Sequence, residues 1–449
     1  MSQSSLLSKA LTTGGLIGLS YGLRFGSNLI LARLLAPEIF GVIVIAHSVR
    51  LGVELLTDVG VEQNIVQNPR GLDERFFNTA WTVQILRGIL LTALFLATAP
   101  WLADFFRIEL AVLVAVSFTP LIIGCASTAI FALAKGLEVR RRNVFELKVE
   151  GINVAVAVLV AAIWPTVWAQ IAALLVSMLG RTLLSYRLPH PPHRLLLDRE
   201  ALRQILSFGK WIMVSSLLMY ASTNLDRLYL GRVASLEILG VFGIAKGLAD
   251  LPPRVARRLS YQIVFPFMAA QSEGREPRQL DELRATRWKF VLLAAAGLGA
   301  ASAWSDWLVR LLYDPRYAAA GWMLAVLLVS AFVSVLSNLN EAKLLGIGRP
   351  AFNSYANVAR LVVLAVAMPS GYAFYGVGGV VLAVLAGELT LYLGIAVGQH
   401  LTDTTFRRQD AAAALLFALI IASVIVVRTQ LDLGVPFAGL FANEGASSP

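Results

Sequence analysis

Two apolar stretches of the sequence carry ionisable side chains at helical spacing. In the stretch at residues 40–61 the spacings are three, four and four, between His47, Arg50, Glu54 and Asp58. In the stretch at residues 238–267 they are four, four and three, between Lys246, Asp250, Arg254 and Arg257. Such spacings place side chains on one face of a helix. Guanidinium groups bind phosphate oxygens through two hydrogen bonds, and carboxylates in membrane spans carry protons. Each polar stripe therefore suits an anionic ligand or ion coupling.

Charged side chains inside an apolar span are costly and usually face an interior cavity. We therefore expect both stripes, and Arg24 in an earlier apolar run, to line a central cavity. The candidates for substrate binding are cationic: Arg24, Arg50, Lys246, Arg254 and Arg257. The candidates for coupling to protons or sodium are carboxylates: Glu54, Asp58 and Asp250. For any one residue alone, a structural ion pair or a side chain reaching from a span end is an equally good interpretation, and Asp226 with Arg227 resembles a local pair.

The composition indicates what surrounds these residues. Of 449 residues, 57% are hydrophobic and 15% are charged, and the mean hydropathy is +0.71. Soluble domains carry about 25% charged residues, so this chain has too few polar side chains to cover a soluble surface. We predict an all-α, multi-pass membrane protein. The net charge of +10 is explained by basic loops at a cytoplasmic membrane face, and nucleic acid is not expected as a partner.

Apolar runs of membrane-spanning length recur along the chain, since a span needs about 20 mainly apolar residues. We predict spans near residues 11–35, 40–61, 79–103, 110–133, 147–164, 167–186, 205–230, 238–267, 290–312, 318–345, 354–368, 374–397 and 411–427. With a cytoplasmic N-terminus, most loop arginines and lysines fall on the inner side. The outer loops then hold only Arg33, Arg107, Arg232 and Arg316.

A domain plan follows from these spans and from one proline-rich stretch. We predict a six-helix lobe at residues 1–187, a cytoplasmic linker at 188–204 and a second six-helix lobe at 205–400. Residues 401–449 then form an extra C-terminal span and a tail. The linker contains Pro189, Pro191 and Pro192.

An internal repeat supports two equivalent lobes. The segment at residues 33–46 aligns without gaps on residues 232–245, and Arg33, Glu38 and Gly41 match Arg232, Glu237 and Gly240. Both segments join an odd-numbered span to an even-numbered one, so the repeats are parallel. Transporters of that plan pack two bundles around a central substrate path. Coincidence among apolar residues is the alternative interpretation.

A proline pair interrupts the second polar stripe. Pro252 and Pro253 lie within the run at 238–267, where proline removes backbone hydrogen bonds. We expect a discontinuous helix beside a hydrated cavity, and a kink packed against a neighbouring helix is the alternative.

Motifs for enzymatic chemistry are missing from the sequence. There is no Walker loop and no Gly-x-Ser-x-Gly motif. The histidines are scattered, although His190 and His193 share the linker, so no metal site is expected. We predict neither a cofactor nor an enzymatic activity.

The sequence resembles the polysaccharide biosynthesis or oligosaccharide flippase family, within the superfamily of multidrug, oligosaccharidyl-lipid and polysaccharide exporters. The residues that carry the resemblance lie at 32–41, at 56–60, at 224–240, and in Phe265-Pro266, Leu312-Tyr313 and Tyr317. The resemblance extends to about residue 400. It implies a flippase that moves undecaprenyl-pyrophosphate-linked oligosaccharide units across the bacterial inner membrane by alternating access between two lobes.

The resemblance also implies a role in exopolysaccharide or O-antigen (lipopolysaccharide) synthesis, with a polysaccharide polymerase as a possible partner. On this view the pyrophosphate pairs with Arg24, Arg50 or Arg254, and the lipid tail stays in the membrane. A cation-coupled multidrug antiporter is the first alternative, but arginine and lysine outnumber aspartate and glutamate within the apolar runs. A membrane polymerase or ligase is the second alternative. Such an enzyme needs a large outer loop to hold its catalytic residues, and this chain has none.

Overall fold

The computed structural model describes residues 3–136, 138–264, 278–402 and 406–441, and within these ranges the chain is built of helices without a β-strand. It forms two compact units, residues 1–220 and 221–449. Among the described residues, six helices are long and apolar enough to cross a membrane, or up to eight if two bent pairs each count as one span. The chain is therefore an all-α, multi-pass membrane protein. The Phe265-Pro266 motif lies outside the described residues.

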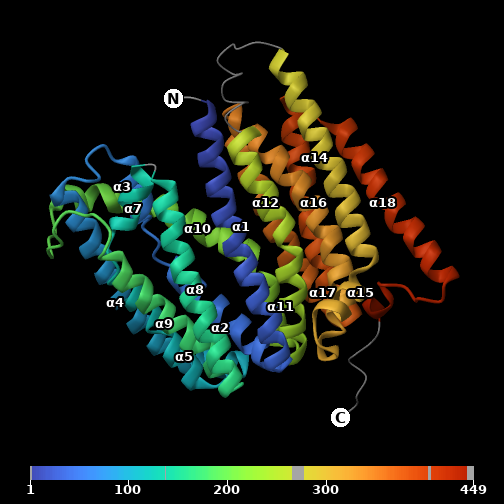
Figure 1. Ribbon diagram of the computed structural model, residues 1–449, viewed down its shortest axis with the longest axis horizontal. Coiled ribbons are helices and arrows are strands. Elements are labelled where there is room, and N and C mark those ends of the chain that lie inside the picture. Colours follow the sequence, from blue (N-terminus) through green and yellow to red (C-terminus); the bar gives the residue numbers. More distant parts are fainter. Residues whose placement is uncertain (1–2, 137, 265–277, 403–405, 442–449) are drawn as a thin grey trace. The chain divides into compact units, whose positions relative to one another are not determined.

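The N-terminal unit is arranged around packed long helices (Figure 1). Its elements are α1 (Gln3–Leu34), α2 (Pro37–Leu55), α3 (Val61–Gln67), α4 (Glu74–Phe106), α5 (Leu110–Val116), α6 (Thr119–Gly124), α7 (Ala129–Lys135), α8 (Val139–Ile163), α9 (Val167–Ser185) and the first part of α10 (Arg199–Val233). Helix α8 packs against both α1 and α9, while α6 packs against α4. Between α9 and α10, residues 189–198 have no regular secondary structure.

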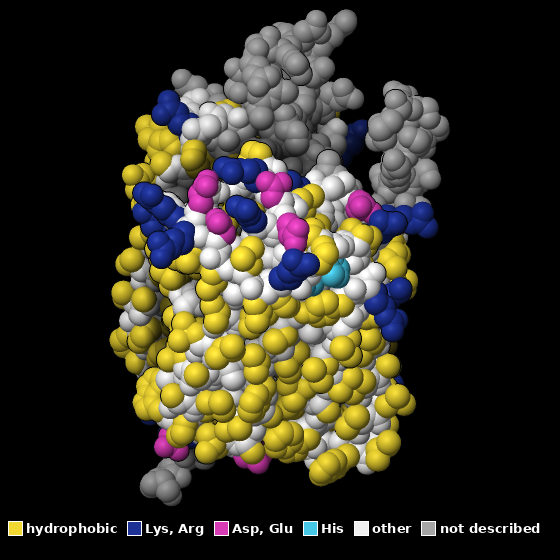
Figure 2. Space-filling view, turned by 90° about the vertical axis from the view of Figure 1, so that its left-hand side faces the viewer, with side chains coloured by type: hydrophobic (Ala, Val, Ile, Leu, Met, Phe, Trp, Pro, Cys, Tyr) yellow, Lys and Arg dark blue, Asp and Glu magenta, His cyan; other side chains and the backbone are white. Residues whose placement is uncertain are grey.

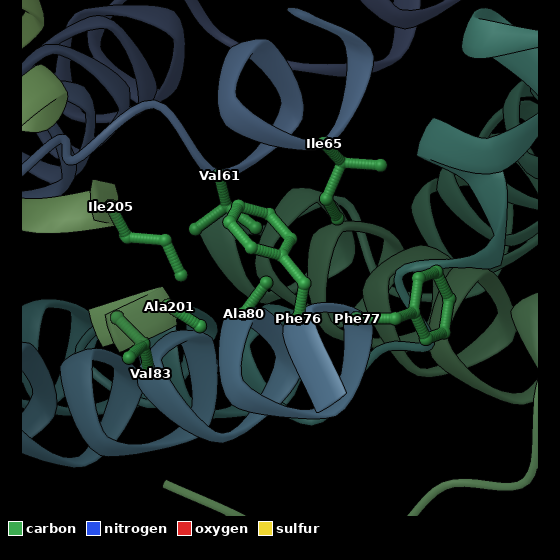
Figure 3. Packing of buried hydrophobic residues seen from close by; sticks show 8 residues of the cluster. All are labelled: Val61, Ile65, Phe76, Phe77, Ala80, Val83, Ala201 and Ile205. Carbon is green, nitrogen blue, oxygen red and sulfur yellow. The ribbon is translucent and has the colours of Figure 1, made fainter. Parts of the chain in front are cut away.

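One apolar cluster of the N-terminal unit joins α3, α4 and the start of α10 (Figure 3). Its buried members are Val61, Ile65, Phe76, Phe77, Ala80, Val83, Ala201 and Ile205. Phe77, Ala80, Ile65 and Ile205 are fully shielded, and the first turns of α10 contribute Ala201 and Ile205 to this cluster. Burying each large side chain of this kind contributes about 1.5–3 kcal/mol.

The C-terminal unit is organised around α16, whose most apolar segment is 83% buried. Its elements are α11 (Leu236–Ala249), α12 (Leu251–Leu259), a π-helical turn (Ser260–Val264), α14 (Arg278–Ala303), α15 (Ser305–Leu312), α16 (Ala320–Gly346), α17 (Pro350–Leu401) and α18 (Arg407–Gln430). Helix α16 packs against α11, α12, α14, α15 and α17. A helix that is apolar on all sides requires such a surrounding.

The long element α17 is two helices folded back on each other. Gly376 breaks the helix with a positive φ of 56° and a ψ of −138°. Small residues let the two arms approach, because a Cβ added at Gly371 would lie 2.5 Å from the carbonyl oxygen of Gly379. The two arms contain the predicted spans at 354–368 and 374–397.

The last helix, α18, is fastened to the C-terminal unit at both ends by arginine–aspartate pairs. Near its start, Asp410 pairs with Arg287 of α14 at 2.5 Å, and both side chains are buried. Near its end, Arg428 pairs with Asp306 of α15 at 2.7 Å. The extra C-terminal span predicted from the sequence is thus an integral helix of this unit.

Three predicted spans are less regular than the sequence suggested. The run at 110–133 is split into α5, α6 and α7 with a bend of 58°, and the run at 290–312 bends by 73° between α14 and α15. The predicted C-terminal boundary of the span at 40–61 was also wrong, because α2 ends at Leu55. Hydropathy does not register these bends, because the segments on both sides are equally apolar.

The helix boundaries repeat with the offset of the sequence repeat, which is 232 − 33 = 199 residues. Helix α1 ends at Leu34 and α2 begins at Pro37; α10 ends at Val233 and α11 begins at Leu236. The two helix ends are 199 positions apart, and so are the two helix starts. The local duplication is therefore present in the structure, while the plan of two six-helix lobes around a central cavity remains a prediction.

Candidate functional site

The polar stripe of the C-terminal unit lies where α11 gives way to α12. Helix α11 ends at Ala249, α12 starts at Leu251, and Asp250 occupies the single position between them. Pro252 and Pro253 fall in the first turn of α12, where a missing backbone N–H is tolerated. The prolines therefore start a new helix at the predicted break. Helix α12 packs against α16, as the alternative of a packed kink also requires, and the hydrated cavity beside the break stays a prediction.

Asp250 is the centre of an ion cluster. Lys246 Nζ donates to Asp250 Oδ1 at 2.9 Å, one helical turn away. Arg227 Nη2 approaches the other oxygen, Oδ2, at 3.4 Å, and Arg254 Nη2 approaches the same oxygen at 3.6 Å. Lys246 also lies 3.9 Å from Asp226, which is buried. The helical spacing thus correctly predicted that Lys246, Asp250 and Arg254 lie together.

The cluster carries more positive than negative charge. Three cations surround the two carboxylates of Asp226 and Asp250. The Arg254 side chain is 48% exposed. Arg257 and Arg258, further along α12, are also exposed, and Arg257 Nε donates to Asn338 Oδ1 of α16 at 3.0 Å. This arrangement offers guanidinium donors to an anionic group.

Part of this cluster was misread from the sequence. Asp226 and Arg227 were interpreted as a local pair, but the Arg227 guanidinium lies against Asp250 and the Asp226 carboxylate faces Lys246. Adjacent residues on a helix point in different directions. This rule could have shown from the sequence that Asp226 and Arg227 do not pair with each other.

The stripe of the N-terminal unit is more tightly paired. Arg50 is buried, and its Nη1 donates to Glu54 Oε1 at 2.5 Å, one turn later in α2. Arg24 makes a two-point contact with Glu150 of α8, through Nε at 3.1 Å and Nη2 at 2.5 Å. The partner Glu150 was not expected, because the sequence gives no spacing signal between α1 and α8.

Asp58 does not belong to the helical stripe, contrary to the prediction. It follows the end of α2 in a turn, where its Oδ1 accepts the N–H of Gly60 at 3.1 Å and its Oδ2 accepts the Ser216 hydroxyl at 2.9 Å. Gly60 has a φ of 59°, a conformation that favours glycine. The aspartate–glycine turn ends the helix before Asp58, so a spacing of four no longer implies a shared face.

A cavity of about 280 Å³ lies beside this stripe within the N-terminal unit. Its polar lining includes Glu54, Asp58, Glu62, Gln84 and Arg87. Arg87 Nε donates to Thr57 Oγ1 at 3.2 Å, and its Nη2 donates to the carbonyl of Glu54. No salt bridge to Arg87 is found in the described part of the chain.

The site residues thus form two separate groups, one in each unit. Lys246, Asp250, Arg254 and Arg257 line one side of α11 and α12, and Arg50, Glu54 and Asp58 surround the cavity or lie next to it. Arg24 lies with Glu150, away from this cavity's lining. Within the described ranges, no group of three or more His, Cys, Asp or Glu side chains is placed to hold a metal ion.

Comparison with known proteins finds polysaccharide biosynthesis proteins similar to this chain. A family model described as polysaccharide biosynthesis protein matches residues 30–318. The succinoglycan biosynthesis transport protein ExoT of Rhizobium meliloti (strain 1021) is 23% identical over 62% of this chain and 57% of its own length. The lipopolysaccharide biosynthesis protein WzxC of Escherichia coli (strain K12) is 22% identical over 58% of this chain and 54% of its own. The matched region thus spans little more than half of these relatives.

Solved transporters share the fold. The lipid II flippase MurJ in an inward closed conformation has a TM-score of 0.72 at 10% identity, covering 94% of this chain and 100% of that one. An inward-facing multidrug resistance transporter of the MATE family has a TM-score of 0.67 at 16% identity, covering 87% and 94%. At such identities the likeness concerns the fold alone, which is that of an all-α membrane transporter.

Proposed function

The chain belongs to the polysaccharide biosynthesis protein family, and from this premise we infer that it moves a lipid-linked oligosaccharide across a membrane. The proposed substrate is an oligosaccharide repeat unit on undecaprenyl pyrophosphate, destined for exopolysaccharide or O-antigen. The names of the relatives support this assignment, because they refer to succinoglycan transport and to lipopolysaccharide biosynthesis.

The observation that carries the proposal is the excess of cations at the break between α11 and α12. Arg254, Arg257 and Arg258 are all exposed on one short helix, directly after Asp250. A pyrophosphate carries several negatively charged oxygens, and guanidinium groups bind such oxygens in pairs. Asp250 and Asp226 hold Lys246 and Arg227. Arg254 has a longer contact of 3.6 Å with Asp250 and is 48% exposed, so its guanidinium can turn to the substrate.

The distribution of charge supports an orientation of the protein, and we propose a direction of transport from it. With a cytoplasmic N-terminus, the arginine-rich loops lie at the cytoplasmic face of the bacterial inner membrane. The substrate enters there and leaves outside by alternating access. Glu54, Asp58 and Asp250 are the proposed coupling residues, Arg24, Arg50, Lys246, Arg254 and Arg257 the proposed binding residues, and a polysaccharide polymerase is the proposed partner.

A transport assay with a matched control tests this proposal. The purified protein is placed in vesicles with a fluorescent undecaprenyl-pyrophosphate oligosaccharide, and its appearance in the opposite leaflet is followed. Arg254→Gln should slow transport by about tenfold or more, since a hydrogen bond to a charged group contributes about 1.5–3 kcal/mol. Arg141→Gln removes an equally charged side chain that is exposed and pairs with Glu138 at 2.7 Å, and it should transport normally. Absence of transport by the wild-type protein would overturn the assignment.

A multidrug antiporter is the second candidate, because a MATE transporter has the same fold. Cationic drugs favour an acidic site, whereas the cluster around Asp250 has three cations for two carboxylates. Export of a cationic dye by vesicles that do not move the oligosaccharide would favour the antiporter instead.

A further inference from the structure

The segment between α9 and α10, residues 189–198, runs as an extended strap along the start of α4. Polar side chains of α4 accept hydrogen bonds from alternate residues of the strap. Arg194 N donates to Asn78 Oδ1 at 2.9 Å, Leu196 N donates to Thr82 Oγ1 at 3.0 Å, and Asp198 N donates to Thr79 Oγ1 at 3.0 Å. The strap thus binds α4 as a β-strand binds a neighbour, with every second N–H directed to the same side.

Aromatic packing fixes the middle of the strap. The His193 ring stacks on the Trp81 ring with 4.6 Å between their centroids, and its Nε2 shares a hydrogen bond of 2.7 Å with Ser127 Oγ. At the end of the strap, Asp198 Oδ1 accepts the N–H of Ala201 at 2.9 Å and caps α10. The strap from His193 to Asp198 is therefore held within the N-terminal unit at both of these residues.

The leucines on this strap are held away from the protein. Leu195 is 73% exposed and Leu197 is 50% exposed. Leu196, between them, is less exposed, at 38%, and its N–H donates to Thr82. Leaving two leucines in water costs about 1.5–3 kcal/mol each relative to burial. The hydrogen bonds to α4 fix the backbone of the strap with its leucines directed outward. We take this as a sign that the surroundings on that side are apolar.

The depth of the strap indicates what that environment is. Its hydrogen-bond partners Thr79 and Thr82 lie at the beginning of the apolar part of α4, a candidate membrane span. The strap is therefore at the level where a membrane's headgroups meet its acyl chains. On the face of the N-terminal unit shown in Figure 2, arginine and lysine side chains gather at one margin of a broad apolar band.

Exposed arginines surround the leucines. Those in the strap or close to it are Arg187, Arg194, Arg199 and Arg203. The nearby carboxylate of Glu200 is occupied by Arg70 at 3.2 Å. Leucines flanked by arginines form the pattern of a segment that lies in the interface of an anionic membrane.

We propose that Leu195 and Leu197 insert into the lipid leaflet beside α4, and that the surrounding arginines bind the phosphates of anionic lipids. The strap is thus a permanent lipid anchor of the N-terminal unit. The lipid in question is bulk membrane lipid and not the transported substrate. The alternative to lipid is a peptide strand that pairs with the outer edge of the strap. Such a peptide would leave the nearby arginines without a role.

Depth-dependent quenching in lipid nanodiscs tests the anchor. The full chain carries one cysteine, Cys125, so Cys125→Ser provides a background for single labels. Leu195→Cys and Leu197→Cys receive an environment-sensitive fluorophore, and the nanodiscs contain phosphatidylglycerol with or without a lipid bearing a nitroxide near its headgroup. We expect strong quenching at both sites.

Asp73→Cys is the matched control for depth. Asp73 is exposed and lies nine residues before Thr82 at the start of α4, which places it about 13 Å further out along the helix. The fluorophore at position 73 should be quenched several-fold less than those at positions 195 and 197. Equal quenching at 73, 195 and 197, or none at 195 and 197, overturns the proposal and favours a protein partner.

A second measurement tests the arginines separately. Phosphatidylglycerol should raise the melting temperature of the wild-type protein in detergent, and the triple variant Arg194→Gln, Arg199→Gln, Arg203→Gln should lose most of that increase. Arg140→Gln with Arg141→Gln, on the exposed start of α8, should keep it. An unchanged lipid response of the triple variant overturns the role of the arginines. Neither measurement involves transport, so its result is independent of the proposed function.

Discussion

Arg428 and Asp306 face each other in a two-point ion pair, with Nη1–Oδ1 and Nη2–Oδ2 distances of 2.9 and 2.7 Å. The arginine side chain is only 2% exposed. Its Nη1 also donates to the carbonyl of Ala303 at 3.1 Å, at the bend between α14 and α15. A single side chain thus holds the end of α18 and satisfies a carbonyl at the bend.

Removing this arginine should destabilise the C-terminal unit strongly. Arg428→Gln leaves Asp306 without its charge partner. Breaking a fully buried pair costs about 3–5 kcal/mol, and since Asp306 is 22% exposed, that range is the upper limit here. We expect a clear drop in melting temperature in detergent. Arg316→Gln is the control, because its pair with Asp314 is exposed and worth less than about 1 kcal/mol. Equal melting temperatures for the two variants would contradict the importance of the buried pair.

Truncation before α18 should prevent stable folding, and one substitution should partly restore it. Arg287 is buried with Asp410 as its ion-pair partner, and it also contacts Asn340 and Gln409. A chain ending at residue 406 leaves this charge buried and unpaired. Arg287→Met in the truncated chain removes the charge and should raise the amount of protein in the membrane. Good accumulation of the truncated chain with Arg287 intact would refute this.

The two aspartates of the C-terminal cluster should differ in importance for transport. Asp250 pairs with the three cations Lys246, Arg227 and Arg254. Asp226 lies 3.9 Å from Lys246, and its Oδ1 also accepts the backbone N–H of Arg227 at 2.8 Å. Asp250→Asn should therefore reduce the transport rate more than Asp226→Asn. Both are compared in vesicles at equal protein content, and the reverse order would argue against Asp250 as the organising residue.

The close approach of the two arms of α17 should be sensitive to a single methyl group. Gly371→Ala places a Cβ against the backbone of Gly379 and should lower the melting temperature. Gly297→Ala in α14 is the control, since nothing lies within 4 Å of the added Cβ. Alanine favours a helix over glycine by about 0.8–1.0 kcal/mol, so this control should be neutral or stabilising. A neutral Gly371→Ala would show that the arms can separate freely.

The stability of the strap should depend on pH through His193. Burial, and to a smaller extent the neighbouring His190, lowers the pKa of His193 to about 4. Unfolded histidine has a pKa of about 6.5, so below that pH the unfolded chain takes up a proton that the folded chain does not. The free energy of unfolding should therefore decrease as the pH falls from about 6.5 to 4.

His193→Gln removes this titrating group and should flatten the pH dependence in that window, as measured by thermal unfolding. His400→Gln, at an exposed position, should behave as the wild type. A His193→Gln variant with an unchanged pH profile would assign the dependence to other groups.

Helix positions, the polar stripes and the ion pairs within one helix were largely predictable from the sequence. The ion pairs between helices were not. The pairs Arg50–Glu54 and Lys246–Asp250 follow from a spacing of four within one helix. Arg24–Glu150 and Arg287–Asp410 join residues more than a hundred positions apart, and hydropathy carries no information on which helices meet. Asp58 was misplaced because a local aspartate–glycine turn overrides helical periodicity.

The two clamps on α18 have a consequence for how the protein is made. Asp410 follows Arg287 by 123 residues, and Arg428 follows Asp306 by 122. At about 5–20 residues per second, a ribosome needs on the order of 6–25 seconds between the two members of each pair. Throughout that interval Arg287 of α14 and Asp306 of α15 lack the ion-pair partners that they have in the folded protein. We therefore expect α14 and α15 to reach their final positions only after α18 has been made.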